Sequence, residues 1–365
     1  MTALFEPLTL RDLTVKNRIW LAPMCQYAVE AEDGVPTDWH LVHLGARAQG
    51  GFGLIIAEAT AVTPEGRISP QDTGLWDDDQ RDAWARIVDF VHTQDAAIGV
   101  QLAHAGRKAS TYRGFPGEPN GSVSREAGGW TTVGPSAEAF VGYTEPVELS
   151  PAEISDVVAA FAESARRADE AGFDVVEIHA AHGYLIHQFL SPLSNHRTDA
   201  YGGDFAGRTR LALEVADAVR AVWPQEKPLF VRISATDWTD GGWDADQSVR
   251  LAAELRTRGV DLVDTSTGGN VLAEIPVGPG YQVPFARQIR DRAQIPTGAV
   301  GLILEPQQAE KILADGDADV VLLARAALRE PSWPQRAAAE LGLSWRDAPY
   351  PAAYVRGRWD DVPAL

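Results

Sequence analysis

Residues 175–184, VVEIHAAHGY, begin as a buried strand and end in a cluster of polar side chains. The apolar run of valine and isoleucine stops at His179, and His182 and Tyr184 follow directly after it. Near-continuous apolar runs are typical of strands whose two faces are both covered, as in parallel sheets. The stretch therefore predicts a parallel strand that ends in three polar side chains.

Runs of this kind recur along the chain, with amphipathic stretches between most of them. The predicted strands are residues 18–24, 54–60, 97–104, 175–179, 229–234, 262–266, 297–301 and 320–323. The predicted helices are residues 39–49, 79–93, 151–171, 207–222, 245–258, 285–292 and 306–314. Eight strands alternating with helices favour an α/β fold that is a single (β/α)8 TIM barrel, because a doubly wound sheet usually has fewer strands. We expect one domain over residues 1–365, since such barrels reach this length as one unit.

Three segments stand outside the alternating pattern. Residues 8–15 alternate in polarity as a short hairpin would, and such an N-terminal hairpin could close the barrel floor. Residues 105–149 form a long loop rich in Gly, Pro and Ser after the third strand, which we expect to cap the active-site face. The tail, residues 330–365, is rich in Pro and Trp, and we expect it at an oligomer interface.

Charge and composition exclude several classes of protein. The formal net charge of −19 argues against nucleic acid or an anionic membrane as a partner. Cys25 is the sole cysteine, which excludes an internal disulfide and an all-cysteine iron–sulfur cluster. Residues 1–10 lack the pattern of a signal peptide, and no apolar run approaches membrane-spanning length, so we expect a cytoplasmic protein.

The cluster at residues 179–184 suits the activation of an oxygen-bearing substrate. The imidazoles of His179 and His182 can donate hydrogen bonds to a carbonyl or nitro oxygen, and the phenol of Tyr184 can deliver a proton. Residues three apart lie on opposite faces of a strand but on one face of a helical turn. Both imidazoles therefore share a pocket only if the strand ends near His179 and the chain turns at once. Two alternatives stay open here: the histidines are structural, or they bind a metal ion.

Two later strand ends carry groups suited to an anion. Gly301 lies at the end of the seventh predicted strand, where the absence of a side chain lets backbone N–H groups approach a ligand closely. Arg325 follows the eighth predicted strand and can bind a phosphate with paired donors. Phosphate sites in this fold often use these two loops. The alternative is that Gly301 forms a turn and Arg325 a salt bridge.

Arg232 lies within the fifth predicted strand, so its guanidinium points either into the barrel or among the surrounding helices. A buried charge needs a partner. That partner is either a carboxylate, for which Glu58 and Glu177 are the candidates, or a bound electron-rich group such as the N1/C2=O edge of a reduced flavin.

Several motifs together resemble the Old Yellow Enzyme family of FMN-dependent ene-reductases over nearly the whole chain. They are APMC at 22–25, EATAV at 58–62, QLAHAGRK at 101–108 and HAAHGY at 179–184, which continues into LSP at 190–192, Asn195, Arg197 and DAYGG at 199–203. Cys25 followed by Tyr27, the His-x-x-His pair and YVRG at 354–357 resemble the bacterial thermophilic-like branch. The chain departs from that branch by continuing to Arg358 and beyond.

The resemblance implies a reaction in two halves. NADPH or NADH reduces FMN and leaves, and an activated alkene, the small-molecule substrate, then takes a hydride from flavin N5. His179 and His182 would hold the carbonyl or nitro oxygen, and Tyr184 would protonate the α-carbon. Tyr27 would contact the substrate oxygen, and Cys25 would lie beside the flavin N5/C4=O edge and tune its potential.

The resemblance also implies a set of cofactor-binding residues and a shared active site. Ala59, Gln101 and Arg232 would bind the isoalloxazine and Gly301, Ala324 and Arg325 would lie near the phosphate, with Ala22, Pro23, Met24 and Cys25 completing the set. In the related branch, an arginine at the position of Arg356 reaches the neighbouring active site. This implies a homodimer or a homotetramer.

Two competing hypotheses belong to other classes. A metal-dependent barrel hydrolase would use His179 and His182 as ligands, but no convincing third ligand cluster stands at another strand end, so no metal is expected. A non-catalytic flavin carrier would have no use for both imidazoles and the phenol of Tyr184. A flavin-dependent reductase is therefore the function that the sequence favours.

Overall fold

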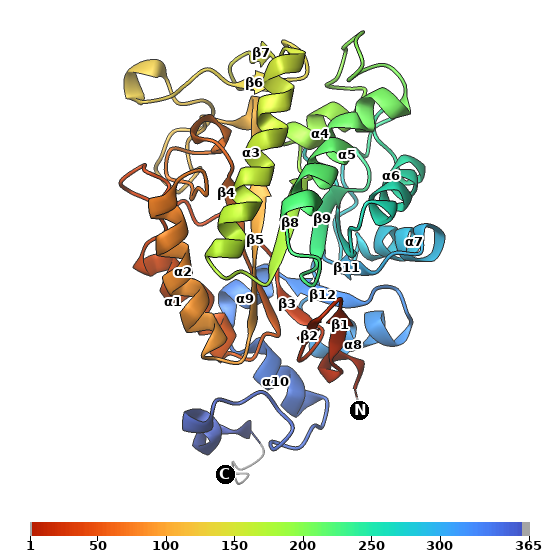
Figure 1. The fold of residues 1–365 in the computed structure, drawn as a ribbon. Helices are drawn as coiled ribbons and strands as arrows, with labels where there is room; N and C mark the ends of the chain where they lie inside the picture. The colour runs from red at the N-terminus through yellow and green to blue at the C-terminus, as the bar shows by residue number, and fades with distance from the viewer. Residues whose placement is uncertain (1, 360–365) are drawn as a thin grey trace.

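The computed structural model describes residues 2–359 and contains a closed barrel of eight parallel strands (Figure 1). In chain order the strands are β3 (Ile19–Leu21), β4 (Leu54–Ala61), β5 (Ala97–Ala103), β8 (Val175–Ala180), β9 (Leu229–Ser234), β10 (Leu262–Ser266), β11 (Thr297–Ala299) and β12 (Val320–Leu323). Each strand pairs with its neighbours in the chain, and β12 pairs with β3 to close the barrel. The predicted TIM barrel is confirmed, and each strand overlaps its predicted run.

Helices surround the barrel, as Figure 1 shows. Seven of them correspond to the predicted stretches: α1 (Asp38–Gln49), α2 (Asp78–His92), α3 (Pro151–Glu170), α5 (Phe205–Val222), α6 (Ala245–Thr257), α7 (Val283–Ala293) and α8 (Pro306–Ala314). The sequence did not indicate the three others: α4 (Leu185–Leu190), α9 (Arg325–Arg329) and α10 (Trp333–Glu340). These have between five and eight residues, too few to show a helical period of apolar residues.

Two buried clusters hold the barrel together. The outer cluster fills the space between the strands and the surrounding helices. The inner cluster fills the barrel itself, where the rings of Trp20 and Phe230 stack with centroids 5.6 Å apart. Leu10 and Val15 belong to this inner cluster, and they come from an antiparallel hairpin of β1 (Leu8–Leu10) and β2 (Leu13–Val15). The lower part of the barrel is thus an apolar core, which leaves the polar side chains to the strand ends.

The long segment after β5 has little regular structure. It contains two short 3-10 helices, η3 (Gly106–Lys108) and η4 (Arg125–Ala127), and a pair of short strands, β6 (Val133–Gly134) and β7 (Val147–Glu148). Two bonds tie its start to the segment after β10: Arg107 Nη2 donates to Asn270 O at 2.7 Å, and Lys108 Nζ donates to Gly269 O at 2.9 Å. The loop after the third barrel strand therefore reaches across to the loop after the sixth.

Short elements lie near both ends of the described residues. Near the N-terminus lies η1 (Ala3–Phe5), and η2 (Pro64–Gly66) follows β4. In the tail, α10 precedes η5 (Ala352–Gly357), and the predicted tail beyond Trp359 lies outside the described residues. No helix within residues 2–359 has the length and apolar character needed to cross a membrane.

Candidate active site

The structure brings His179, His182 and Tyr184 together at the carboxyl end of β8. The strand ends at Ala180, and His182 has a φ of 58°, so the chain turns sharply there. The ring centroids of His179 and His182 lie 5.1 Å apart, and those of His179 and Tyr184 lie 5.0 Å apart. The turn that the shared pocket requires is therefore present.

Hydrogen bonds fix the orientation of both imidazoles. The amide of Ala181 donates to His179 Nδ1 at 3.2 Å, which leaves the proton of a neutral ring on Nε2. That Nε2 faces His182 Nδ1 at 3.3 Å. On its other side, His182 Nε2 lies 2.8 Å from Ser266 Oγ, which accepts a hydrogen bond from Gln282 Nε2 at 3.0 Å. The two facing nitrogens can thus serve one oxygen atom of a ligand.

Burial keeps these groups uncharged. Burial lowers the pKa of His179 and His182 well below the ordinary histidine value, and the charge of Arg232 lowers both further. Burial also raises the pKa of Tyr184 well above that of a free phenol, and the electrostatic effect of Cys25 is the next largest cause of this rise. The imidazoles are therefore neutral hydrogen-bond donors, and the phenol keeps its proton.

Cys25 and Tyr27, which follow β3, lie in the same part of the molecule. Both pack with Tyr184 against a small buried cluster that includes Ala59. Burial raises the pKa of the Cys25 thiol well above its ordinary value, with the charge of Asp72 next in size. Cys25 is therefore a protonated thiol rather than a nucleophile.

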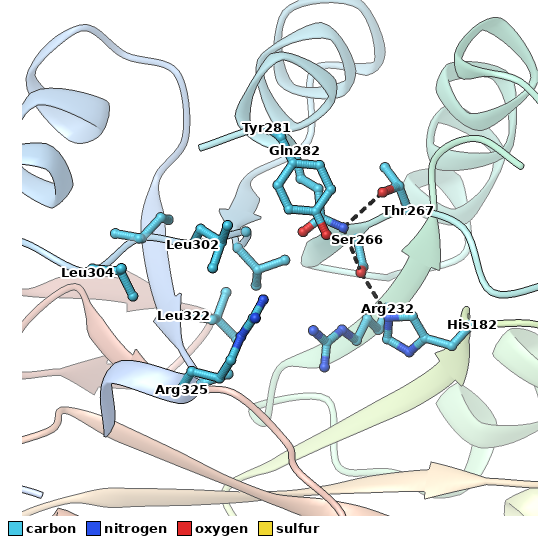
Figure 2. Close-up of a pocket in the computed structure, with 14 residues that line it drawn as sticks. His182, Arg232, Ser266, Thr267, Tyr281, Gln282, Leu302, Leu304, Leu322 and Arg325 are labelled. Atoms are coloured by element: carbon cyan, nitrogen blue, oxygen red, sulfur yellow. Dashed lines mark hydrogen bonds between the residues drawn. The ribbon is translucent and has the colours of Figure 1, made fainter. Parts of the chain in front are cut away.

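A cavity of about 240 Å³ adjoins His182 (Figure 2). It is lined by His182, Arg232, Ser266, Thr267, Tyr281, Gln282, Val300, Gly301, Leu302, Ile303, Leu304, Leu322, Ala324 and Arg325. The predicted phosphate residues Gly301, Ala324 and Arg325 thus share one cavity with Arg232, although β9 and β12 are not adjacent in the barrel.

Sequence reasoning missed four polar residues of this cavity. Ser266 and Thr267 lie at the carboxyl end of β10. Because the active site of a TIM barrel is formed at the carboxyl ends of its strands, the sequence could have identified both residues. Tyr281 and Gln282 lie at the start of α7, far from any strand end in the sequence, and no local signal marks them. Gln282 Nε2 bonds to both Ser266 and Thr267, at 3.0 Å and 2.9 Å.

The predicted carboxylate partners of Arg232 were wrong. Its Nε lies 2.9 Å from Asp264 Oδ2, and the two residues are direct neighbours in the pairing of β9 with β10. Glu58 instead pairs with His40 at 3.1 Å, and Glu177 accepts a hydrogen bond from Gln101 at 2.7 Å. The pairing of adjacent strands, which the sequence does not show, decided the partner.

The cavity has the chemistry of an FMN site. The guanidinium groups of Arg232 and Arg325 both project into it, and within residues 2–359 Arg325 has no acidic partner. Gly301 has a φ of +109°, and a Cβ there would lie 2.7 Å from Gln282 Oε1, so only glycine fits without displacement. A backbone that permits close approach, with an unpaired guanidinium beside it, suits a phosphate.

The other predicted residues divide into two groups. Ala22, Ala59 and Gln101 are buried at or near the carboxyl ends of their strands, and Pro23 and Met24 continue the segment that leads to Cys25. Arg356, in contrast, is exposed on η5 and does not line the cavity of its own chain.

A closed parallel barrel whose cavity receives two guanidinium groups, with two neutral imidazoles at its edge, suits an oxidoreductase that binds a flavin. Residues 3–344 match the model of the NADH:flavin oxidoreductase / NADH oxidase family, and the chain belongs to this family. The NADPH dehydrogenase of Geobacillus thermodenitrificans is 50% identical over 98% of both chains. That of Bacillus subtilis is 47% identical over 97% of this chain and 98% of its own. The solved structure of the old yellow enzyme homologue from Zymomonas mobilis superposes with a TM-score of 0.77 at 30% identity over the full length of both chains.

These comparisons confirm the predicted family. The protein is an oxidoreductase of the Old Yellow Enzyme type, with FMN as cofactor and a nicotinamide nucleotide as reductant. A metal-dependent hydrolase has no support from them. Within residues 2–359, no group of three or more His, Cys, Asp or Glu side chains is placed to hold a metal ion.

Proposed function

We propose that this protein is an NADPH dehydrogenase that reduces the C=C bond of activated alkenes, namely α,β-unsaturated carbonyl or nitro compounds. The observation that carries the proposal is the cluster of His179, His182 and Tyr184 beside the cavity that suits FMN. The name of the similar Geobacillus and Bacillus proteins, NADPH dehydrogenase, supports NADPH as the reductant.

Each residue of the cluster has one task in this reaction. FMN, when bound, supplies the hydride chemistry. The N–H groups of His179 and His182 hold the substrate oxygen and draw electron density from the alkene. Tyr184, whose phenol keeps its proton, delivers that proton to the α-carbon as the general acid. Tyr27 contacts the substrate oxygen, and Cys25 adjusts the potential of the flavin as a neutral thiol.

In this proposal, FMN extends from one end of the cavity to the other. Gly301, Ala324 and Arg325 hold the phosphate, where the backbone is open and the guanidinium is unpaired. At the other end, the isoalloxazine is bound by Arg232, Gln101 and Ala59, together with the segment of Ala22, Pro23, Met24 and Cys25. Arg232 lies on the cavity wall beside His182, which supports an orientation of FMN with its isoalloxazine at this end.

The active site is completed by a second chain in a homodimer or homotetramer, with Arg356 as the contributed residue. Its exposure on η5, away from the cavity of its own chain, supports this arrangement. We expect the reaction to take place in the cytoplasm.

A visible spectrum of the purified protein tests the proposal. We expect one tightly and non-covalently bound FMN per chain, bleached by NADPH without air and restored by adding an enone. A colourless protein with stoichiometric zinc would contradict the flavin assignment. A flavin that NADPH reduces but that no enone or nitroalkene reoxidises would contradict the alkene reductase assignment.

A further inference from the structure

Four polar residues occupy the interior of the barrel on four consecutive strands. They are Gln101 on β5, Glu177 on β8, Arg232 on β9 and Asp264 on β10. All are buried, and both carboxyl groups belong to residues with no exposed surface. Barrel interiors of this kind are usually filled by branched apolar side chains, as the inner cluster is at the level of Phe230. Two buried acids carry a desolvation cost that calls for a function.

The four residues form two cross-strand pairs, one joined by a hydrogen bond and the other an ion pair. Gln101 and Glu177 are direct neighbours in the pairing of β5 with β8, and Gln101 Nε2 donates to Glu177 Oε1 at 2.7 Å. Arg232 and Asp264 are direct neighbours in the pairing of β9 with β10, with Nε and Oδ2 at 2.9 Å. In each pair, an acid lies beside a side-chain nitrogen of the residue opposite it on the preceding barrel strand.

The outer ends of the Gln101 and Arg232 side chains make no hydrogen bond to another residue within residues 2–359. Gln101 Oε1 has no hydrogen-bond partner there, yet it is not among the enclosed unpaired atoms, so solvent reaches it. Arg232 lines the cavity, and its Nη groups donate no hydrogen bond to another described residue. Glu177 Oε2, in contrast, is sealed and unpaired. Glu177 and Asp264 are therefore enclosed by protein. Only the side-chain ends of Gln101 and Arg232, which these acids orient, can contact a ligand in the cavity.

We propose that Glu177 is a positioning residue for the flavin ring: it binds Nε2 of Gln101 and so turns Oε1 of that amide outward as a fixed hydrogen-bond acceptor, while Asp264 aims the guanidinium of Arg232. An unrestrained amide presents its oxygen and its nitrogen about equally, and only one of these matches a given atom of a ligand. This inference rests on the proposed function, because it takes Gln101 and Arg232 as residues that meet the isoalloxazine.

A substitution that tests this role of Glu177 must remove the hydrogen-bond acceptor for Gln101 and keep the volume of the side chain. Glu177→Met does this, whereas Glu177→Gln keeps a carbonyl oxygen at the same place. Burial raises the pKa of Glu177 to about 8, with the charge of Asp264 as the next cause, so at pH 7 the Gln variant replaces one mostly neutral group by another. Glu177→Met therefore tests the loss of the acceptor, and Glu177→Gln is the control in which the acceptor stays and the charge at pH 7 changes little.

The experiment measures FMN affinity by reconstitution of the apoprotein, together with the midpoint potential of the bound flavin. We expect Glu177→Met to weaken FMN binding roughly three- to tenfold, the size expected for one oriented hydrogen bond, and to shift the potential. We expect Glu177→Gln to stay within about twofold of the wild type, because the acceptor remains. In a Gln101→Leu background, Glu177→Met should cause no further change, because Glu177 acts through Gln101.

Three results would overturn the inference: wild-type affinity and potential in Glu177→Met, an undiminished effect in the Gln101→Leu background, or an equal effect of Asp237→Leu, which likewise removes a buried acceptor and keeps the volume. Asp237 is a matched control, since it is equally buried but binds His187 and Ser191 instead. If Glu177→Met does not fold, Glu177→Ala removes the same acceptor and has the same expected outcome. A wild-type protein that binds no FMN would refute the proposed function itself, which distinguishes that failure from this one.

Discussion

His182 has a backbone conformation that residues other than glycine rarely adopt. Its φ of 58° places it in the left-handed region, at a cost of about 1–2 kcal/mol for such a residue. Lys108 Nζ donates to the His182 carbonyl at 2.8 Å, and the His182 amide donates to Ser234 Oγ at 2.9 Å. These bonds hold the strained residue in place, which is typical of a site where geometry matters more than local stability.

Tyr184→Phe should slow the reoxidation of reduced flavin by an enone, because it removes the proton donor. General acids contribute on the order of 10²–10⁴ in rate, so a loss in this range is expected. Flavin reduction by NADPH should keep its wild-type rate, since that half-reaction needs no proton from the phenol. Anaerobic stopped-flow absorbance follows the two halves separately, and equal slowing of both would make Tyr184 a structural residue.

The rate of reoxidation by the enone should be flat across the ordinary titration range of histidine. Because the pKa values of His179 and His182 are lowered, both rings are already neutral at pH 6.5 and gain a proton only at more acidic pH. The raised pKa of Tyr184 moves the loss of its proton to the alkaline side of the range of a free phenol. Single-turnover rates from about pH 5.5 to about 8.5 check this, and a step centred near 6.5 would show that a histidine changes charge during the reaction.

At the scale of elements, the turn between β8 and α4 assembles the cluster. Gly183 has a φ of 72°, and a Cβ there would lie 2.2 Å from the carbonyl oxygen of Gly269 in the segment after β10. The turn is therefore packed directly on a neighbouring loop, with no room for a side chain. This contact holds the turn that carries His182 against the segment that follows Ser266, at the end of the next strand but one.

Gly183→Ala should destabilise the fold more than Gly203→Ala does. The two glycines have nearly equal φ values, 72° and 74°, but a Cβ at Gly203 has no atom within 4 Å. Gly203→Ala therefore carries only the conformational cost of about 1–2 kcal/mol, while Gly183→Ala adds a backbone clash. Thermal unfolding of both variants under one protocol gives the comparison, and equal midpoints would mean that the loop moves away freely.

At the scale of the molecule, the tail has two parts. The first packs on its own barrel: Trp333 is fully buried, and Gln335 Nε2 donates to the carbonyl of Gln49 at 3.0 Å. The second, around η5, leaves Tyr354 and Trp359 about half exposed, at 53% and 46%. Aromatic side chains near an exposed arginine are typical of interface hot spots.

Removal of the chain from Tyr350 onward should raise the Michaelis constant for the alkene and leave FMN bound. The reason is that Arg356 is expected to serve the active site of a neighbouring chain, whereas the residues that line the cavity all precede Tyr350. Sedimentation of the intact protein should give the mass of two or more chains at assay concentration. A monomer, or a truncated protein with an unchanged Michaelis constant, would exclude the shared site.

The barrel, the family motifs and most of the strand ends that carry chemistry could be predicted from the order of the residues alone. This was possible because a doubly buried strand and an amphipathic helix each leave a pattern within a few neighbouring residues. For the same reason, His179, His182 and Tyr184 were identifiable as a group, since they lie within one turn of the chain.

Which side chains face each other across strands, in contrast, depends on the folded barrel. Asp264 as the partner of Arg232, Gln101 as the partner of Glu177, and the bond from Ser266 to His182 all follow from how adjacent or neighbouring strands align around it. Gln282 enters the cavity from the start of α7, after a loop without a recognisable pattern. Closure of the barrel brings together residues tens of positions apart, and the alignment of its strands depends on packing over the whole molecule, which no local stretch of sequence records.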